Sequence, residues 1–362
     1  MASPLKFGVE LELFLGHKQG KSPYKSWTDL ADTLSRRLTR AGVPNHVKKR
    51  GVKETYKDWS LMREMTIGED TMNALYGIEL VSPVFDARQS QWVVDIQSIY
   101  RVLDKHFTTY ESPKCSTHVH VSTSPDALTK EEAANLAAAV LYYEPAIDTL
   151  MPAHRVATNS YWCRSNRVSH MFAGIESVQG IQTIDGYVQF CKAEHRAGRP
   201  IPVSPSPSGS LVGLDTALKI VRACHEGGEF GMDQAMNWFS ASSAYGQTKG
   251  MTPDFVKGKV YKWNFDSLYR SKDAPSKDGT LEFRLPPGSL CAEDAGMWVS
   301  LAVTFVAGVL ASVHLNDFPS PAGSGASVYE LKVLLEHGRT VLGWQDLGLL
   351  QDQLDQLEQL QL

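Results

Sequence analysis

The stretch Gly8-Val9-Glu10-Leu11-Glu12 decides the fold, because it alternates like a β-strand and places two carboxylates on the same strand face. Three later stretches alternate in the same way: Gly77-Ile78-Glu79-Leu80-Val81-Ser82-Pro83, Thr117-His118-Val119-His120-Val121-Ser122 and Gly279-Thr280-Leu281-Glu282-Phe283-Arg284. In each of them a charge or an imidazole stands where a half-buried strand normally points an apolar side chain. We expect these four strands to join one sheet whose polar face carries metal ligands.

Length and composition describe an ordinary globular protein that is large enough for a sizeable core. The chain has 362 residues, of which 43% are hydrophobic and 21% are charged. Because the four strands span residues 8–284, one catalytic unit should occupy most of the chain. The formal net charge of -4 argues against a general nucleic-acid or anionic-membrane surface. The basic run His46-Val47-Lys48-Lys49-Arg50 is interpreted as a solvated loop.

Cysteine spacing and hydropathy indicate a cytoplasmic protein. The five cysteines are far apart, odd in number and without a CxxC pair, which is typical of free thiols in a reducing compartment. No signal peptide is expected, since Lys6 and Glu10 are charged and no long apolar run surrounds them. Residues 295–313 carry no charge and approach the length of a membrane span. Their Gly, Ser and Thr content and the preceding Glu293 and Asp294 favour a buried helix instead.

The remaining pattern predicts an α+β fold, in which an antiparallel or mixed sheet is flanked by helices. Besides the His-x-His strand, strands are expected at residues 5–15, 58–66, 76–81, 259–265 and 279–285. Helices are expected at residues 27–41, 89–107, 129–150 and 214–225, the third opened by a capping box of Thr129 and Glu132. We assign residues 1–320 to a single catalytic domain, in which residues 171–258 form a substrate-specific helical subregion. Residues 321–362 are expected to be a helical tail packed on the core.

Glu10 and Glu12 present the first chemical question. Two ionised carboxylates this close repel each other strongly at low dielectric, so one must protonate or cations must lie between them. Mg²⁺ or Mn²⁺ with oxygen ligands is the common solution. The alternative is a solvent-exposed face on which the pair is harmless, and for Glu-Leu-Glu taken alone that alternative is favoured.

Two other strands also place a pair of ionisable side chains on one face. His118 and His120 share a face, and a His-x-His pair is typical of a metal or phosphate site, whereas a lone strand histidine is usually structural. Glu282 and Arg284 also share a face, where a cross-strand salt bridge is the simplest explanation. Because four such strands occur in one chain, a single shared site is favoured over four separate structural explanations.

Together these residues resemble the amidoligase family of the glutamine synthetase and glutamate–cysteine ligase superfamily. Members of this superfamily are ATP-dependent carboxylate–amine ligases built around a curved, mainly antiparallel sheet flanked by helices. The resemblance covers the order and rough spacing of elements between residues 7 and 290. It rests most on THVHVS (117–122) and GTLEFR (279–284), with support from GVELE (8–12), IELVSP (78–83), the Arg/Asn/Tyr-containing stretch 155–164 and KWN (262–264).

The resemblance implies a role for each residue that matches a family motif. The metal ligands would be Glu10, Glu12, Glu79, His118 and Glu282, which would bind two or three Mg²⁺ (or Mn²⁺) ions. The catalytic residues would be Glu10, His120 near the nucleotide phosphates, and Arg284 at the transferring phosphoryl group. ATP would be bound by His120, Lys262, Asn264 and Arg284. The substrate carboxylate or phosphate would be held by Arg155, Asn159, Arg164 and Arg167.

The chain departs from the family pattern in two places. Family members usually follow a Trp with an Asp and a Ser at a fixed distance, whereas here Trp59 is followed by the chemically similar Glu64 and Thr66. Residues 171–251 match no family motif, and substrate choice would be made there. Two loops, 198–209 and 271–279, are candidate lids that would keep water from an activated intermediate.

The resemblance implies an ATP- and Mg²⁺-dependent ligase that forms an amide through an acyl phosphate. Phosphoryl transfer needs mainly positioning and charge neutralisation, and the chain has no GxxxxGK[ST] loop. The expected partners are a small-molecule or peptide carboxylate and an amine, without nucleic acid or membrane, on a monomer or small homo-oligomer. Three alternatives stay open: an ATP-dependent small-molecule phosphotransferase of the same fold, a metal-dependent hydrolase and a non-catalytic nucleotide-binding module.

Overall fold

The computed structural model describes residues 4–19, 21–49, 51–124, 127–157, 162–176, 178–197, 199, 212–226, 231–238, 257–268, 279–319 and 321–361. Within these ranges ten strands form one sheet in the order β2-β3-β5-β1-β8-β10-β9, with β4 on β5 and with β6 and β7 on β1. The strands are β1 (Leu5–His17), β2 (Asn45–Val47), β3 (Trp59–Arg63), β4 (Glu69–Asp70), β5 (Leu75–Val81), β6 (Phe85–Asp86), β7 (Phe107–Tyr110), β8 (Thr117–Thr123), β9 (Trp263–Asn264) and β10 (Leu281–Phe283).

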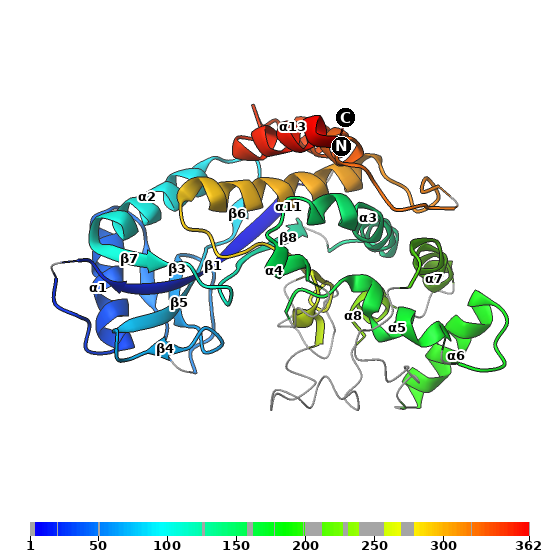
Figure 1. The fold of residues 1–362 in the computed structure, drawn as a ribbon, viewed down its shortest axis with the longest axis horizontal. Coiled ribbons are helices and arrows are strands. Elements are labelled where there is room, and N and C mark those ends of the chain that lie inside the picture. The colour runs from blue at the N-terminus through cyan, green and yellow to red at the C-terminus, as the bar shows by residue number, and fades with distance from the viewer. Residues whose placement is uncertain are drawn as a thin grey trace.

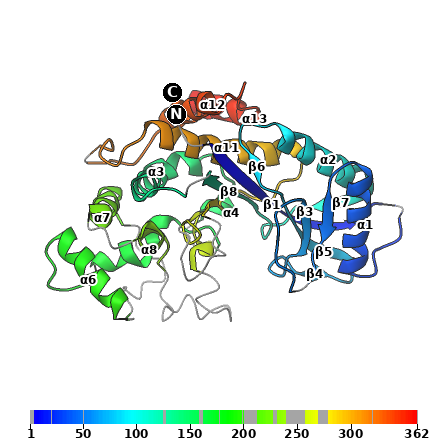
Figure 2. The same cartoon turned by 180° about the vertical axis from the view of Figure 1, so that it is seen from behind.

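The same described residues also form the helices. They are α1 (Trp27–Arg40), α2 (Gln91–His106), α3 (Lys130–Asp148), α4 (Ala153–Val156), α5 (His170–Ala173), α6 (Ile184–Arg196), α7 (Leu214–Glu226), α8 (Met232–Asn237), α11 (Ala292–Ser312), α12 (Val328–Leu342) and α13 (Leu349–Gln361), with 3-10 turns η1 (Asn166–Val168), η2 (Gly174–Glu176) and η3 (Lys257–Val260). Figure 1 shows α11 running over β1 and β8, with α13 stacked on its outer side and α5–α8 grouped away from α1. In Figure 2 the two termini again lie close together beside α12.

The sheet is mixed and mainly antiparallel, which confirms the expected α+β architecture with flanking helices. Every strand pair within the described residues is antiparallel except β2 with β3. The four strands predicted from the sequence lie in succession as β5, β1, β8 and β10. A glutamine synthetase-like core stays a prediction.

The core lies between the apolar face of this sheet and helices α2 and α11. The odd-numbered residues of β1, from Leu5 to Leu15, are all buried, and Phe7 meets Trp92 of α2 edge-on at 5.8 Å between ring centroids. The indole N–H of Trp59 donates to Asp95 of α2 at 3.0 Å, which ties β3 to the same helix. This burial leaves the even-numbered residues of β1, among them Glu10 and Glu12, on the opposite face.

Helix α11 is the apolar segment that the sequence analysis weighed as a membrane span. Its 21 residues are long and apolar enough by composition, yet 78% of its most apolar window is buried inside the protein. It packs on β1, β8, α2, α3, α12 and α13. Its place in the core therefore agrees with the buried-helix interpretation.

Most predicted helices are confirmed, and one predicted strand is only partly right. The capping box of Thr129 and Glu132 opens α3, with reciprocal bonds between side chains and backbone. The strand expected at residues 259–265 is reduced to β9, because the Asp266 carboxylate accepts from the Gly258 N–H at 2.6 Å and holds a 3-10 turn. Helices α12 and α13 lie within the range 321–362 that was expected to be a helical tail, and both pack on α11. The candidate lids, apart from residues 199 and 279, lie outside the described residues.

Candidate functional site

Strand register brings the predicted polar residues to one face of the sheet. Glu12 pairs with Glu79 across β1 and β5, and Glu10 pairs with His118 across β1 and β8. His120 of β8 stands opposite Glu282 of β10. Four stretches separated by up to 272 positions in the sequence, from Glu10 to Glu282, thus form one continuous site.

One part of this site, here called the paired group, is balanced in charge. It consists of Glu10, His118, His120, Glu282 and Arg284. The Glu10 carboxylate lies 3.0 Å from His118 Nδ1 and 3.1 Å from His120 Nε2. Glu282 accepts a hydrogen bond from Arg284 and lies 3.5 Å from His120 Nε2. Each carboxylate in the paired group therefore has a basic partner within reach.

The pKa directions in the paired group follow from these contacts. Burial alone would raise the pKa of Glu10, but His120 and His118 outweigh burial and hold it well below its usual value. Burial is likewise outweighed at Glu282, where Arg284 and His120 lower the pKa to about 2. Burial would lower the pKa of His120, but Glu282 and Glu10 raise it to about 9. The carboxylates are thus held ionised and His120 is held protonated when no metal is bound.

A second part, here called the acid group, lacks this balance. It consists of Glu12, Glu64 and Glu79, one carboxylate oxygen from each lying within 4.8 Å of the others. No Lys or Arg of the described chain forms an ion pair with any of the three. Burial, followed by repulsion from Glu10, Glu12 and Glu64, raises the pKa of Glu79 well above its usual value. Burial also raises the pKa of Glu12, with His118 acting in the opposite direction.

Glu64 was not among the predicted metal ligands, and the structure adds it to the site. It follows β3, whose register places Met62 opposite Glu79, so the side chain two positions further on reaches the same face. Thr66 orients it, because both the backbone N–H and the hydroxyl of Thr66 donate to Glu64 Oε1, at 2.7 and 2.6 Å. The sequence signal that could have identified Glu64 as a site residue was the Trp59…Glu64…Thr66 spacing.

The donor set of the site fits hard divalent cations. The acid group offers only carboxylate oxygens, the ligands that Mg²⁺ and Mn²⁺ prefer. Glu10, His120 and Glu282 form a second set of ligand atoms within 4.8 Å of one another. His118 lies between the two sets, with Nδ1 3.9 Å from Glu12 and 3.8 Å from Glu282. Two adjacent cation positions are therefore compatible with these residues.

The two remaining nucleotide-binding candidates have different surroundings. Asn264 donates from Nδ2 to Glu282 at 2.7 Å and accepts from the Asp266 N–H, so it touches the site and orients Glu282. Lys262 instead contacts helix α3. Its ammonium is 2.6 and 2.7 Å from the two Asp148 oxygens and 3.1 Å from Glu144. Burial would lower the pKa of Lys262, but Glu144 and Asp148 raise it.

The three predicted substrate arginines each have different neighbours. Arg155 is buried and donates to the backbone carbonyls of Arg284 and Leu285, each at 2.8 Å, and so supports the chain just after β10. Arg164 joins Tyr261 through a backbone bridge. Burial raises the pKa of Asp148 to about 6, and Arg167 lies close enough to act weakly in the opposite direction. Asn159 lies outside the described residues.

A cavity of about 410 Å³ opens beside the paired group. Its lining includes the polar residues Glu10, His120 and Thr280 and, beside them, Tyr56, Val81 and Val84. The Thr280 hydroxyl lies 3.4 Å from His120 Nδ1. The cavity therefore joins ionic chemistry to an aromatic and aliphatic surface, a volume and lining suited to a small organic ligand.

Comparison with known proteins supports the family suggested by the motifs. A family model described as "Putative amidoligase enzyme" matches residues 3–197, which include β1, β5, β8 and Glu64 but not β10. No curated protein matches the chain. Because the family match covers more than half of the 362 residues, the chain belongs to the amidoligase family.

Proposed function

We propose that this amidoligase-family protein is an ATP- and Mg²⁺-dependent ligase that joins a carboxylate to an amine through an acyl phosphate. The observation that carries the proposal is the acid group, in which Glu12, Glu64 and Glu79 converge and none of them forms an ion pair with a Lys or Arg of the described ranges. Three converging carboxylates, of which Glu12 and Glu79 are buried, require protons or divalent cations. The adjoining set of Glu10, His120 and Glu282 provides for a second cation.

The chain's own residues would divide the work by position. The acid group would hold one Mg²⁺, and Glu10 with Glu282 would hold another, with His118 or His120 completing the ligands. When bound, these ions would neutralise the phosphate charge of ATP. Arg284, whose side chain is 12% exposed, is placed to hold a phosphoryl oxygen beside them, and Asn264 keeps Glu282 oriented.

The cavity beside His120 would receive the nucleoside part of ATP. Tyr56 provides an aromatic surface for a base, and the valines at positions 81 and 84 provide apolar contact. Glu10 and His120, both candidate metal ligands, line the same cavity, and the phosphates would lie beside them. The acid and the amine would approach from the side of β9 and β10. The free thiols of all five cysteines are consistent with a cytoplasmic setting, which we propose as well.

One observation favours a second candidate function. Glu10, His120 and Glu282 taken alone are two carboxylates and one imidazole, a ligand set compatible with a catalytic zinc ion of a hydrolase. The acid group has no role in such a site, so the ligase proposal accounts for more of the structure.

Nucleotide and metal binding provide the first test. We expect the thermal midpoint to rise by a few degrees when ATP and Mg²⁺ are added together, since a ligand at a hundred times its Kd adds about 2.7 kcal/mol. Glu79→Gln should lose this rise. The matched control is Glu69→Gln, a carboxylate on β4 that pairs with Arg63 outside the site. If Zn²⁺ alone raises the midpoint and ATP adds nothing, the hydrolase candidate replaces the ligase.

A turnover assay then addresses the acyl phosphate. With a carboxylate mixture labelled with ¹⁸O, a ligase of this mechanism transfers one ¹⁸O atom from the acid to inorganic phosphate when the amide forms. Release of ADP without label in phosphate would point to a phosphotransferase or to simple ATP hydrolysis.

A further inference from the structure

A second cavity lies in the helix layer, away from the polar face of the sheet. Its volume is about 600 Å³, and it is lined by residues of α2, of α11 and of the turn between α12 and α13. Trp92, one of its walls, packs on Phe7, whose side chain belongs to the apolar face of β1. The cavity is therefore separated from the metal ligands by the sheet itself.

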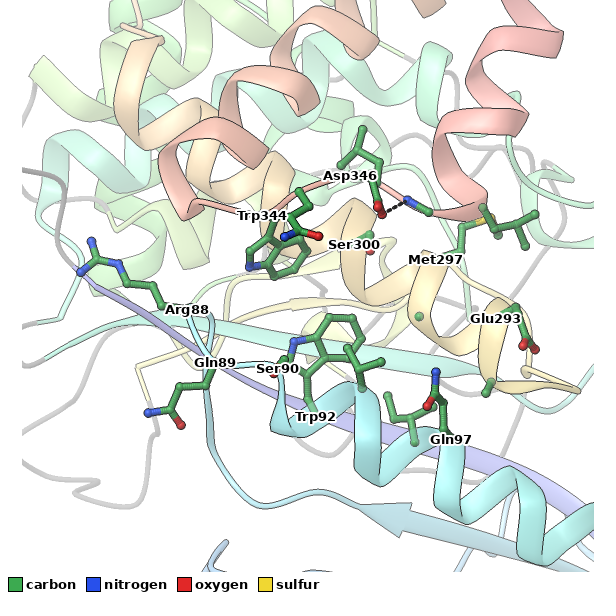
Figure 3. Close-up of a pocket in the computed structure, with 18 of the residues that line it drawn as sticks. Arg88, Gln89, Ser90, Trp92, Gln97, Glu293, Met297, Ser300, Trp344 and Asp346 are labelled. Carbon is green, nitrogen blue, oxygen red and sulfur yellow. Dashed lines mark hydrogen bonds between the residues drawn. The ribbon is translucent and has the colours of Figure 1, made fainter.

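The most distinctive feature of this cavity is an aromatic wall. The indole rings of Trp92 and Trp344 lie side by side with centroids 5.7 Å apart and an interplanar angle of 33° (Figure 3). Trp344 is fixed because its indole N–H donates to the Ala87 carbonyl at 2.6 Å. Two adjacent indoles held in this way present a broad aromatic surface to the cavity, on which a planar ring can stack.

Helix α11 supplies a floor that is open at its centre. A Cβ added at Gly296 would meet no heavy atom within 4 Å, although glycine inside a helix costs about 0.5–1 kcal/mol relative to alanine. Ser300 lies one turn further along α11, between Trp344 and Met297 in the view of Figure 3. The helix thus leaves open space above Gly296, where a ligand could rest against its backbone.

Two hydrogen-bond donors face this cavity without a partner. Ser300 and Trp92 are 7% and 8% exposed, and both line the cavity. Among the described residues, neither the Ser300 hydroxyl nor the Trp92 indole N–H makes a hydrogen bond. Both donor atoms are accessible to water in the cavity, and a ligand acceptor can take the place of that water. An acceptor on a ligand would satisfy them.

We propose that this cavity binds an uncharged planar aromatic molecule that carries a hydrogen-bond acceptor, such as a ring carbonyl. The aromatic surface would bind the ring, the open space over Gly296 would admit it, and Ser300 and Trp92 would donate to its acceptor. Among the charged lining residues, Arg88 is positive and Glu293 and Asp346 are negative, so their sum is one negative charge and a ligand anion is disfavoured. The proposal is independent of the ligase function.

Coumarin is a suitable probe, because it is planar and uncharged and has a ring carbonyl but no donor. The readout is the set of indole N–H signals of the eight tryptophans in a ¹H–¹⁵N spectrum, with Trp92→Phe and Trp344→Phe for assignment. We expect coumarin to shift the Trp92 and Trp344 signals saturably, with a Kd of about 1 mM or tighter. δ-Valerolactone, which keeps the carbonyl but lacks the aromatic ring, should leave both signals in place.

Two variants make the result specific to the cavity. Gly296→Leu fills the open space and should weaken coumarin binding at least tenfold. Ser300→Ala keeps the shape and should weaken it roughly two- to tenfold, the usual range for one hydrogen bond. The absence of saturable shifts would overturn the proposal, as would equal binding of δ-valerolactone or unchanged binding in both variants. Shifts that follow protein concentration instead of coumarin would identify the cavity as a contact between two copies.

Discussion

The acid group and the paired group share one face of the sheet but differ in how their charges are balanced. In the paired group, Glu10 and Glu282 are stabilised as anions by two imidazoles and a guanidinium. In the acid group, Glu12 and Glu79 have no Lys or Arg partner among the described residues, and their pKa values rise. The difference shows that the fold neutralises one group internally and leaves the other to be neutralised from outside.

Removing a carboxylate from the acid group should have the largest effect on activity and the opposite effect on stability. We expect Glu79→Gln to reduce Mg²⁺- and ATP-dependent turnover by about a thousandfold or more, because a metal ligand is lost at a phosphoryl-transfer site. The metal-free protein should melt roughly 2–4 °C higher, because buried repulsion is relieved. Paired measurements of turnover and of the midpoint in EDTA check both parts. A lower midpoint would show that the acid group is not strained without metal.

Removing a carboxylate from the paired group should be destabilising as well as inactivating. Glu282→Gln leaves Arg284 without its acidic partner, whereas His120 keeps Glu10, and breaking a buried pair in this way costs about 3–5 kcal/mol. Urea unfolding in EDTA, compared with Glu79→Gln, measures the difference. Equal midpoints for the two variants would mean that the difference in charge balance between the two groups does not affect the free energy of unfolding.

A positive charge alone should not replace the planar guanidinium of Arg284 in catalysis. Arg284→Lys keeps the positive charge beside Glu282 but loses the planar fork, so we expect kcat to fall about a hundredfold with a small change in stability. Steady-state kinetics and a thermal melt, each with Mg²⁺ and ATP, check this prediction. Near-normal kcat would assign Arg284 to the support of Glu282 alone.

The smallest effect should appear in the pH dependence of the metal-free protein. His120 has a pKa raised to about 9 in the folded state and about 6.5 when unfolded, so its stabilisation is complete below pH 6.5. That stabilisation should be lost as the pH rises from 6.5 through 9, on the order of 1–3 kcal/mol. Chemical unfolding in EDTA across this range measures it, and His120→Gln should flatten the curve. A wild-type free energy of unfolding that rises with pH over the same range would contradict the contacts of His120 with Glu10 and Glu282.

The sequence predicted the site well where a single strand carries the information. Period-2 alternation placed Glu10 with Glu12 and His118 with His120 on common faces, because a strand has no other way to orient neighbouring side chains. It did not place Glu64 among the metal ligands, because that depends on the register of β3 against β5. It also gave no sign that Lys262 would pair with Glu144 and Asp148 of α3, since these contacts span 118 and 114 positions.

Local patterns therefore determined the strands, the capping box of α3, the apolar face and the residues that could bind a metal. These features follow from backbone periodicity and hydrogen bonding within a few residues. Only the tertiary structure decided which carboxylates would be neighbours, which would receive a basic partner, and which would be left in the acid group. Charge balance in a buried site depends on distances of a few ångströms between strands far apart in sequence, and no local pattern encodes those distances.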